Sequence, residues 1–147
     1  MTNFVVGFMF TPDENKVALI QKNRPAWQKG LLNGIGGKIE PFDVSEKAAI
    51  CREFEEEAGV KTHPEDWFQF ATLNVIGVGP VHVFKAVSDN VQHVENKTDE
   101  EINLYDTQNL PSNIIPNLKW LIPLSLDKNL CFEEPLMLNE QAQQKIA

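Results

Sequence analysis

Apolar positions along the chain fall into short runs that are separated by turn-forming residues. The runs at 4–10 and 16–21 are rich in strand-forming residues, and a Pro-Asp-Glu-Asn segment at 12–15 lies between them. This pattern predicts a β-hairpin near the start of the chain. Residues 22–38 are rich in Gly, Asn and Lys, and they predict a loop.

The next segment has the periodicity of an amphipathic helix, because its apolar positions share one face. Asp43 or Ser45 can cap the N-terminus of this helix. We expect the helix to end near Ala58, because Gly59 is a typical C-terminal stop. The predicted buried stripe consists of Ile50, Cys51, Phe54 and Ala58.

Downstream of this helix the pattern returns to strands. Runs at 67–75 and 81–87 predict two strands joined by a glycine-containing turn, and a short strand is expected at 101–105. Helical spacing recurs at 118–126, where Pro123 must kink the helix or lie near one of its ends. The last 20 residues have no pattern that determines an element.

Length and composition fit one domain. A chain of 147 residues, of which 42% are hydrophobic, can bury a core without disulfides, and we expect a single α+β domain over residues 1–147. Cys51 and Cys131 form no CxxC pair, which favours a reduced, cytoplasmic setting. No segment has the length of a membrane span, and the first apolar run lacks the basic flank of a signal peptide.

The chain is acidic, with a formal net charge of -8 and an isoelectric point of about 4.8. A surface that binds polymeric nucleic acid needs clustered Lys and Arg, so we exclude that class of partner. A small phosphate-bearing substrate is compatible with this charge if divalent cations offset it. The candidate for such a cation site is a cluster of acids in the first predicted helix.

Four glutamates occupy five positions of that helix. At about 100° per residue, Glu53, Glu56 and Glu57 project together, whereas Glu55 points elsewhere. Convergent carboxylates repel one another unless a cation lies between them, and Mg²⁺ and Mn²⁺ prefer oxygen ligands. The alternative interpretation is a solvated acidic face, which is the usual meaning of a run of charges.

The glycine-containing segment and the acidic helix together resemble the Nudix box. That signature is Gly, five residues, Glu, seven residues and then Arg-Glu-apolar-x-Glu-Glu-x-Gly-apolar. The second half matches from Arg52 to Val60 at every fixed position. In the first half, Gly37 is followed by Asp43 in place of Glu, and one extra residue lies before Arg52. In the family this upstream acid usually has a structural role, in which it caps or braces the loop.

The resemblance extends beyond the box, from the first hairpin to about Asp127. It includes Pro25-x-Trp27, the glycine-containing segment 33–40 and the segment 117–124. The family likeness implies an α/β/α sandwich with a mixed β-sheet. It also implies a Mg²⁺-dependent hydrolase, with Mn²⁺ as a possible substitute, that acts on nucleoside diphosphates linked to another moiety.

The resemblance implies roles for the residues of the box. Glu53 and Glu57 are expected metal ligands, and Glu56 is a further ligand or the group that orients or deprotonates the attacking water. The carbonyl of Gly37 is a further candidate ligand, because a glycine lets the backbone approach an ion closely. Arg52 is expected to brace Glu53 through a charge-assisted hydrogen bond.

Residues outside the box could complete the site. Members of the family often supply a further acid from a later loop, and among residues 99–101 we favour Glu100. Asn33 either turns the chain or contacts a purine base, as an Asn does at this place in relatives that hydrolyse purine triphosphates. The cations that could meet phosphates, unless they are solvated surface charges, are Lys22, Arg24 and Lys38.

The substrate is less well determined than the reaction. We expect a (deoxy)nucleoside triphosphate, with ADP-ribose and dinucleoside polyphosphates as alternatives, and a monomer or homodimer. Relatives that recognise oxidised purines tend to have acids just before the segment that contains Trp120, and residues 115–117 contain none. A sensor that binds a nucleotide without cleaving it is a further alternative. The retained box glutamates favour the enzyme over the sensor.

Overall fold

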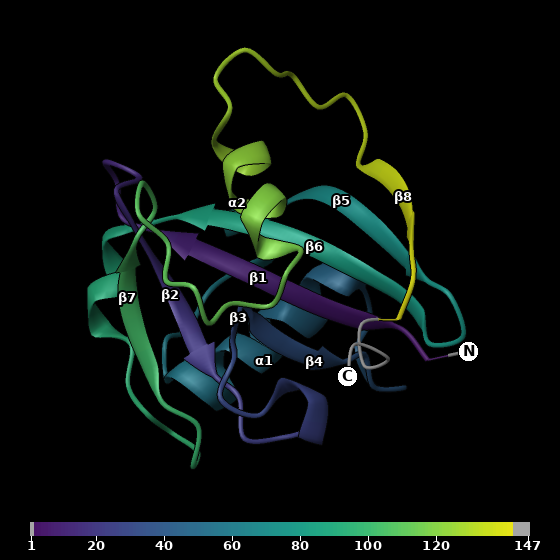
Figure 1. The fold of residues 1–147 in the computed structure, drawn as a ribbon, viewed down its shortest axis with the longest axis horizontal. Coiled ribbons are helices and arrows are strands. Elements are labelled where there is room, and N and C mark those ends of the chain that lie inside the picture. Colours follow the sequence, from purple (N-terminus) through teal and green to yellow (C-terminus); the bar gives the residue numbers. More distant parts are fainter. Residues whose placement is uncertain (1, 143–147) are drawn as a thin grey trace.

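Residues 2–142 are described by the computed structural model, and they form one mixed sheet between two helices (Figure 1). The strands are β1 (Phe4–Phe10), β2 (Lys16–Gln21), β3 (Leu32–Asn33), β4 (Ile35–Lys38), β5 (Phe68–Val75), β6 (Gly79–Val87), β7 (Ile102–Asp106) and β8 (Leu136–Glu140). The helices are α1 (Glu46–Ala58) and α2 (Leu118–Leu126), with 3₁₀ turns η1 (Ala26–Gln28), η2 (Pro64–Asp66) and η3 (Asp89–His93). The strand order is β3-β2-β1-β6-β5-β8, with β4 also paired to β1 and β7 to β2.

Strand β1 lies at the centre and divides two cores. Successive side chains of a strand point to opposite faces. Met9 therefore packs in the cluster that contains Phe54 of α1, whereas Phe8 packs in the cluster that contains Leu121 of α2. The predicted α/β/α sandwich with a mixed sheet is confirmed.

The predicted hairpin is present, but its two strands soon diverge. Phe10 pairs with Val17 beside the turn, and the rest of β1 pairs in parallel with β6 and antiparallel with β4. The carboxylate of Asp13 holds the turn by accepting hydrogen bonds from the Thr11 hydroxyl at 2.6 Å and from the Asn15 backbone N–H at 2.9 Å. Strand β2 then runs beside β7 instead.

The prediction of a loop over residues 22–38 is wrong for its second half. Strand β4 occupies its last four residues and pairs with β1, with Gly36 opposite Val6. A Cβ added at Gly36 would lie 1.9 Å from the carbonyl oxygen of Val5, so only glycine fits between these backbones. Glycine is a poor strand former in general, and this tertiary contact is not visible in the local pattern.

Helix α1 has the predicted ends. Its N-cap is Ser45, whose side-chain oxygen accepts the Ala48 backbone N–H at 3.0 Å. Asp43, the alternative cap, has another role. At the other end Gly59 adopts a φ of 73°, and its N–H donates to the carbonyl of Glu55 at 2.9 Å.

The remaining predicted elements are also present, with small shifts of their ends. Strands β5 and β6 pair antiparallel, β7 begins one residue later than expected, and α2 keeps Pro123 in its interior. Strand β8 was not predicted. It lies at the edge of the sheet, parallel to β5, and its Leu136 and Met137 are exposed, so its sequence has no clear alternation. Within residues 2–142, no helix is long and apolar enough to cross a bilayer.

Candidate active site

One wall of the candidate site is the contact between β4 and α1. A Cβ added at Gly37 would lie 2.1 Å from a carboxylate oxygen of Glu53. The backbone of the strand therefore lies directly against this carboxylate, in space that a side chain would fill. The glycine brings its own carbonyl group and the Glu53 carboxylate into one neighbourhood.

Glu53 and Glu57 are one helical turn apart and are both partly withdrawn from water. Burial raises the pKa of Glu53, and Arg52 only partly opposes that shift. Burial raises the pKa of Glu57 to about 7; the nearby carboxylates of Glu53 and Glu100 act in the same direction, and Lys22 opposes them. Among the residues that the structure describes, Oε2 of Glu57 is buried and has no hydrogen-bond partner. Such an oxygen is costly to bury without a partner.

Glu56 shares the helix face but not the burial of its neighbours. Its side chain is 58% exposed, against 12% for Glu53, and it accepts a hydrogen bond from Arg52 at 3.2 Å. Helical spacing therefore predicts which side chains share a face, whereas the burial of each carboxylate depends on the strand packed beside it. Glu55 is exposed, as expected.

Arg52 connects the helix to the segment that precedes it. Its guanidinium donates to Asp43 through Nε at 2.9 Å and Nη2 at 2.8 Å, and to the carbonyl of Lys38 at 3.0 Å. These hydrogen bonds lower the pKa of Asp43 and raise that of Arg52. The ion pair between Arg52 and Glu53 is longer, at 3.6 Å. Asp43 is thus the main partner of Arg52.

The segment that contains the extra residue also carries an exposed aromatic side chain. Phe42 is 69% exposed, and its ring centroid lies 5.4 Å from the guanidinium carbon of Arg52. The carboxylate of Asp43 also accepts the backbone N–H of Glu40 at 2.8 Å. Asp43 therefore braces this segment through contacts with both Glu40 and Arg52.

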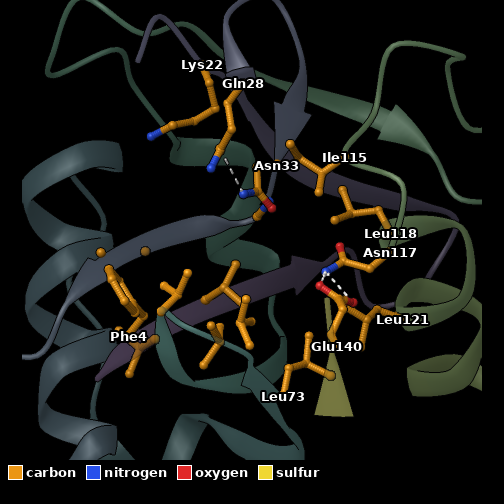
Figure 2. A pocket seen from close by; sticks show the side chains of 18 of the residues that line it. Phe4, Lys22, Gln28, Asn33, Leu73, Ile115, Asn117, Leu118, Leu121 and Glu140 are labelled. Atoms are coloured by element: carbon orange, nitrogen blue, oxygen red, sulfur yellow. Dashed lines mark hydrogen bonds between the residues drawn. The ribbon is translucent and has the colours of Figure 1, made fainter. Parts of the chain in front are cut away.

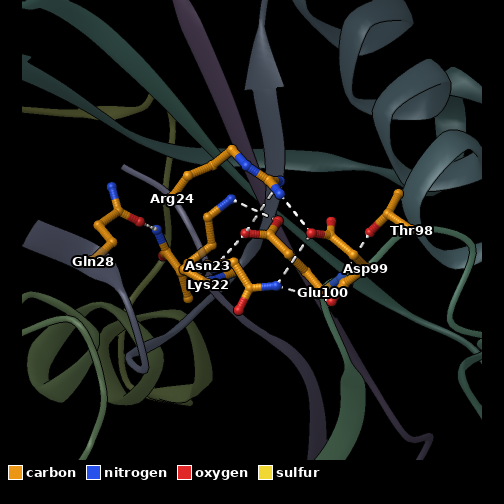
Figure 3. A network of polar contacts seen from close by, with 9 residues as sticks. Lys22, Asn23, Arg24, Gln28, Thr98, Asp99 and Glu100 are labelled. Carbon is orange, nitrogen blue, oxygen red and sulfur yellow. Dashed lines mark hydrogen bonds and ion pairs between the residues drawn. The ribbon is translucent and has the colours of Figure 1, made fainter. Parts of the chain in front are cut away.

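Glu100 lies in a network of polar contacts with the segment that follows β2 (Figure 3). Its side chain is 4% exposed and accepts the backbone N–H of Asn23 at 2.6 Å and the ammonium group of Lys22 at 3.2 Å. Burial tends to raise its pKa, but these donors outweigh that effect and lower it. Arg24 pairs with Asp99 at 2.5 Å. Both expected functional groups, Glu100 and Arg24, are thus engaged with protein partners.

The donor set around Glu57 fits a hard divalent cation. It includes the carboxylates of Glu53 and Glu57, the backbone of Gly37 packs against Glu53, and Oε2 of Glu57 has no hydrogen-bond partner within residues 2–142. Within residues 2–142, no three His, Cys, Asp or Glu side chains are already grouped as a metal site. The residues that could hold a metal are Gly37, Glu53 and Glu57, with Glu56 and Glu100 reaching it only after leaving their present partners.

A cavity of about 390 Å³ opens beside this wall (Figure 2). Lys22 and the glycines of β4 belong to its lining, and so does Asn33, whose amide nitrogen donates to Gln28 at 3.4 Å. The other polar residues of the lining are Gln28, Asn117 and Glu140, and most of the remaining lining is apolar. This composition suits a flat, partly apolar ligand with a few polar contacts.

Two of the expected substrate-binding cations do not line this cavity. Lys38 is exposed at the end of β4, and Arg24 lies outside the lining. Asn33 does line the cavity, although its side-chain oxygen also accepts the backbone N–H of Gly34 at 2.8 Å, as a chain-turning Asn does. The two interpretations of Asn33 are therefore compatible.

Glu140 is an acidic residue of the cavity that sequence reasoning missed. It lies in the C-terminal segment that carried no pattern, yet it contacts Asn117, within the stretch 115–117 that contains no acid of its own. The fold therefore brings an acid from the C-terminal segment next to residues 115–117. Only the pairing of β8 with β5 reveals this proximity.

Comparisons with known proteins place this geometry in a family. The model of the NUDIX domain matches residues 1–119. A search of curated proteins gave no match. A solved MutT structure from a study of Aliivibrio salmonicida and Vibrio cholerae has 19% identity and a TM-score of 0.66, over 84% of this chain and 98% of that chain.

Two further solved structures are similar in fold. The MutT protein from Bacillus halodurans has 15% identity and a TM-score of 0.69, over 100% of this chain and 94% of that chain. A MutT/nudix family protein from Enterococcus faecalis has 19% identity and a TM-score of 0.62, over 71% of this chain and 43% of that chain. At these identities the structural likeness supports the fold, and the family match rests on the domain model.

Proposed function

The chain belongs to the NUDIX family of hydrolases, and on that premise we propose that it cleaves a (deoxy)nucleoside triphosphate to the monophosphate and pyrophosphate with Mg²⁺. Mn²⁺ is proposed as a substitute ion. The observation that carries the proposal is the buried Oε2 of Glu57, which has no hydrogen-bond partner among the described residues and belongs to a side chain one helical turn from a carboxylate packed against Gly37. A cation at this place would satisfy that oxygen and offset the charge of a polyphosphate.

We propose that Glu53, Glu57 and the carbonyl of Gly37 hold the ion. A bound Mg²⁺ would neutralise phosphate charge and lower the pKa of a water molecule. Glu56 is exposed and accepts a hydrogen bond from Arg52, and once it leaves Arg52 its carboxylate could join the ion or accept a proton from water. Arg52 acts as a positioning residue, because its bonds to Asp43 fix the helix against the segment before it.

Glu100 is proposed to change its binding partner when the metal binds. Glu100 holds Lys22 at 3.2 Å, and the charges of both groups act on Glu57. For Glu100 to become a ligand, it must exchange Lys22 for the cation. Lys22, which lines the cavity, would then be released toward the phosphates.

The cavity is proposed to hold the nucleotide. Its apolar walls suit a base, Asn33 can contact that base, and the lining by Lys22 and the β4 glycines connects it to the proposed metal site. Arg24 and Lys38 are proposed to meet the outer phosphates, and Arg24 must leave Asp99 to do so. The enzyme is proposed to act in the cytoplasm as a monomer or homodimer.

A substrate panel with product analysis tests the proposal. Nucleoside triphosphates, ADP-ribose and dinucleoside polyphosphates are incubated with Mg²⁺, and products are separated by anion-exchange chromatography. We expect equal amounts of monophosphate and pyrophosphate from a triphosphate. Preferential cleavage of ADP-ribose or of a dinucleoside polyphosphate would contradict the substrate class, and binding without turnover across the panel would favour a sensor.

A further inference from the structure

A second hollow, a groove of about 540 Å³, lies at the opposite end of the central strands from the cavity. The end of β5 and the start of β6 line the cavity, whereas the start of β5 and the end of β6 line the groove. Helix α2 contributes its first half to the cavity and its last residues to the groove. Much of the remaining lining of the groove is the segment 127–132, which leads from α2 toward β8 (Figure 1). The groove is therefore separate from the candidate active site.

The floor of the groove is apolar and open to solvent. Its side chains Phe68, Val87 and Leu130 are 46%, 45% and 46% exposed. The half-buried ring of Phe132 lies 6.1 Å, between ring centroids, from both Phe68 and the buried Phe70. This contact joins the floor to the core and fixes its shape. Exposed apolar side chains that are gathered in one hollow are typical of a surface that a partner covers.

The two lysines of the groove are already paired within the protein. Lys85 donates to the carbonyl of Ser125 at 2.7 Å and pairs with Glu14 at 3.3 Å, and Lys128 pairs with the same carboxylate. Burial tends to raise the pKa of Glu14, but the hydrogen bonds from the two lysines outweigh that effect and lower it. Glu14 therefore stays ionised and offsets the positive charge at this side of the groove.

The two aspartates of the groove have no such basic partners. Asp66 accepts the backbone N–H of His63 at 2.8 Å, and Asp127 accepts that of Asn129 at 2.9 Å. Within residues 2–142 neither carboxylate forms an ion pair. Asp127 also follows directly after α2, where the helix end carries partial negative charge. The groove thus combines an apolar floor with two acids that lack a counterion from the protein.

We propose that this groove docks a segment of another protein that carries Lys or Arg beside apolar side chains. The apolar side chains would cover the exposed floor, and the basic groups would meet Asp66 and Asp127. Charge disfavours a second copy of this chain as the occupant, because each copy has a formal net charge of -8 and carries the same two acids. The docked segment leaves the cavity at the other end of the strands open.

The test uses a short probe peptide with free access to the groove. The N-acetylated peptide amide Arg-Leu-Phe-Leu-Arg is titrated into the ¹⁵N-labelled protein, without metal or nucleotide, and followed by NMR. Its comparison peptides are Glu-Leu-Phe-Leu-Glu, which reverses the charge, and Arg-Ser-Gly-Ser-Arg, which lacks the apolar side chains. Because no turnover is involved, the outcome is independent of the proposed hydrolase.

Two variants alter the groove and two matched controls do not. The double variant Asp66→Asn with Asp127→Asn removes both charges and keeps an oxygen for each backbone N–H. Its control is Asp106→Asn, because Asp106 is exposed and likewise accepts the N–H of the second residue after it, outside the groove. Phe68→Ser opens the floor, and its control is Val44→Ser at a 92% exposed position elsewhere.

We expect the basic apolar peptide to shift the amide signals of Phe68, Val87 and Leu130. The double aspartate variant should raise its Kd a few-fold, as for exposed ion pairs, and Phe68→Ser should raise it about fivefold or more. Both controls should bind like the wild type. The same spectra report the folded state, and the aspartate variant decides the outcome if Phe68→Ser loses its fold.

Four results would overturn the inference. They are no binding at the groove, equal binding of the acidic peptide, equal binding of the basic peptide that lacks apolar side chains, and binding that neither groove variant weakens. Sedimentation velocity of the free protein covers the remaining occupant. A dimer that Phe68→Ser dissociates would show that a second copy covers the groove, and it would overturn the inference as well.

Discussion

Glu57→Gln should make the metal-free protein more stable at alkaline pH. Burial raises the pKa of Glu57 from 4.5 to about 7, so the folded state binds a proton more tightly than the unfolded state. The free energy of unfolding therefore falls as the pH rises from about 4.5 to about 7. A glutamine stays neutral and avoids this loss.

The size of the effect follows from the shift in pKa. The difference between 7 and 4.5 is 2.5 units, and at about 1.4 kcal/mol per unit this corresponds to about 3 kcal/mol above pH 7. For a chain of this length, 1 kcal/mol moves the thermal midpoint by about 3 °C. Glu57→Gln should thus raise the midpoint by about 10 °C at pH 8 in EDTA, and most of the gain should vanish at pH 5.

The assay is thermal unfolding by circular dichroism at pH 5 and pH 8, with EDTA or with Mg²⁺. Glu55→Gln is the matched control, because it removes the same charge from an exposed position of the same helix. Mg²⁺ should raise the midpoint of the wild type and of Glu55→Gln more than that of Glu57→Gln. Equal midpoints for the wild type and Glu57→Gln at pH 8 in EDTA, or a difference that persists at pH 5, would refute the reasoning.

Substitutions at four further positions separate the metal site from the fold. Glu53→Gln should lower turnover by orders of magnitude with little change in thermal midpoint, because it removes ligand charge and not core packing; near-normal kcat would exclude Glu53 as a ligand. Gly37→Ala should weaken Mg²⁺ binding, measured by calorimetry, since the added Cβ would displace the Glu53 carboxylate. Gly36→Ala should instead lower the thermal midpoint, because the added Cβ would meet the backbone of β1. The reverse assignment of these two effects would contradict the geometry. Asp43→Ala should lower kcat by about tenfold or more by freeing Arg52, and Asp43→Glu should restore part of it; no change in either variant would show that the contact is dispensable.

Local signals predicted much of the fold. The caps of α1, the central strands and the second helix all follow from periodicity and from capping residues. Strand β4 escaped prediction because its glycines have low strand propensity, and the need for them arises from the nearby backbone of β1. Strand β8 escaped because an edge strand with exposed apolar residues shows no alternation.

In the candidate site, too, local sequence predicted some features, whereas others depend on tertiary contacts. Helical spacing put Glu53, Glu56 and Glu57 on one face, since that depends on chain geometry alone. It could not rank their burial, which is set by the contact of β4 with the helix. It also could not reveal that Glu100 holds Lys22, because that contact joins segments far apart in the sequence.

The most direct test of the proposed metal-dependent hydrolase is a Mg²⁺ titration of triphosphate hydrolysis by the EDTA-treated wild type and Glu57→Gln, with products identified by ³¹P NMR. We predict no turnover without metal, saturable turnover with Mg²⁺ or Mn²⁺ in the wild type, and monophosphate and pyrophosphate in equal amounts. Glu57→Gln should be slower by orders of magnitude at every concentration of Mg²⁺. Hydrolysis without metal, near-normal turnover of Glu57→Gln, or release of diphosphate and phosphate would contradict the assignment.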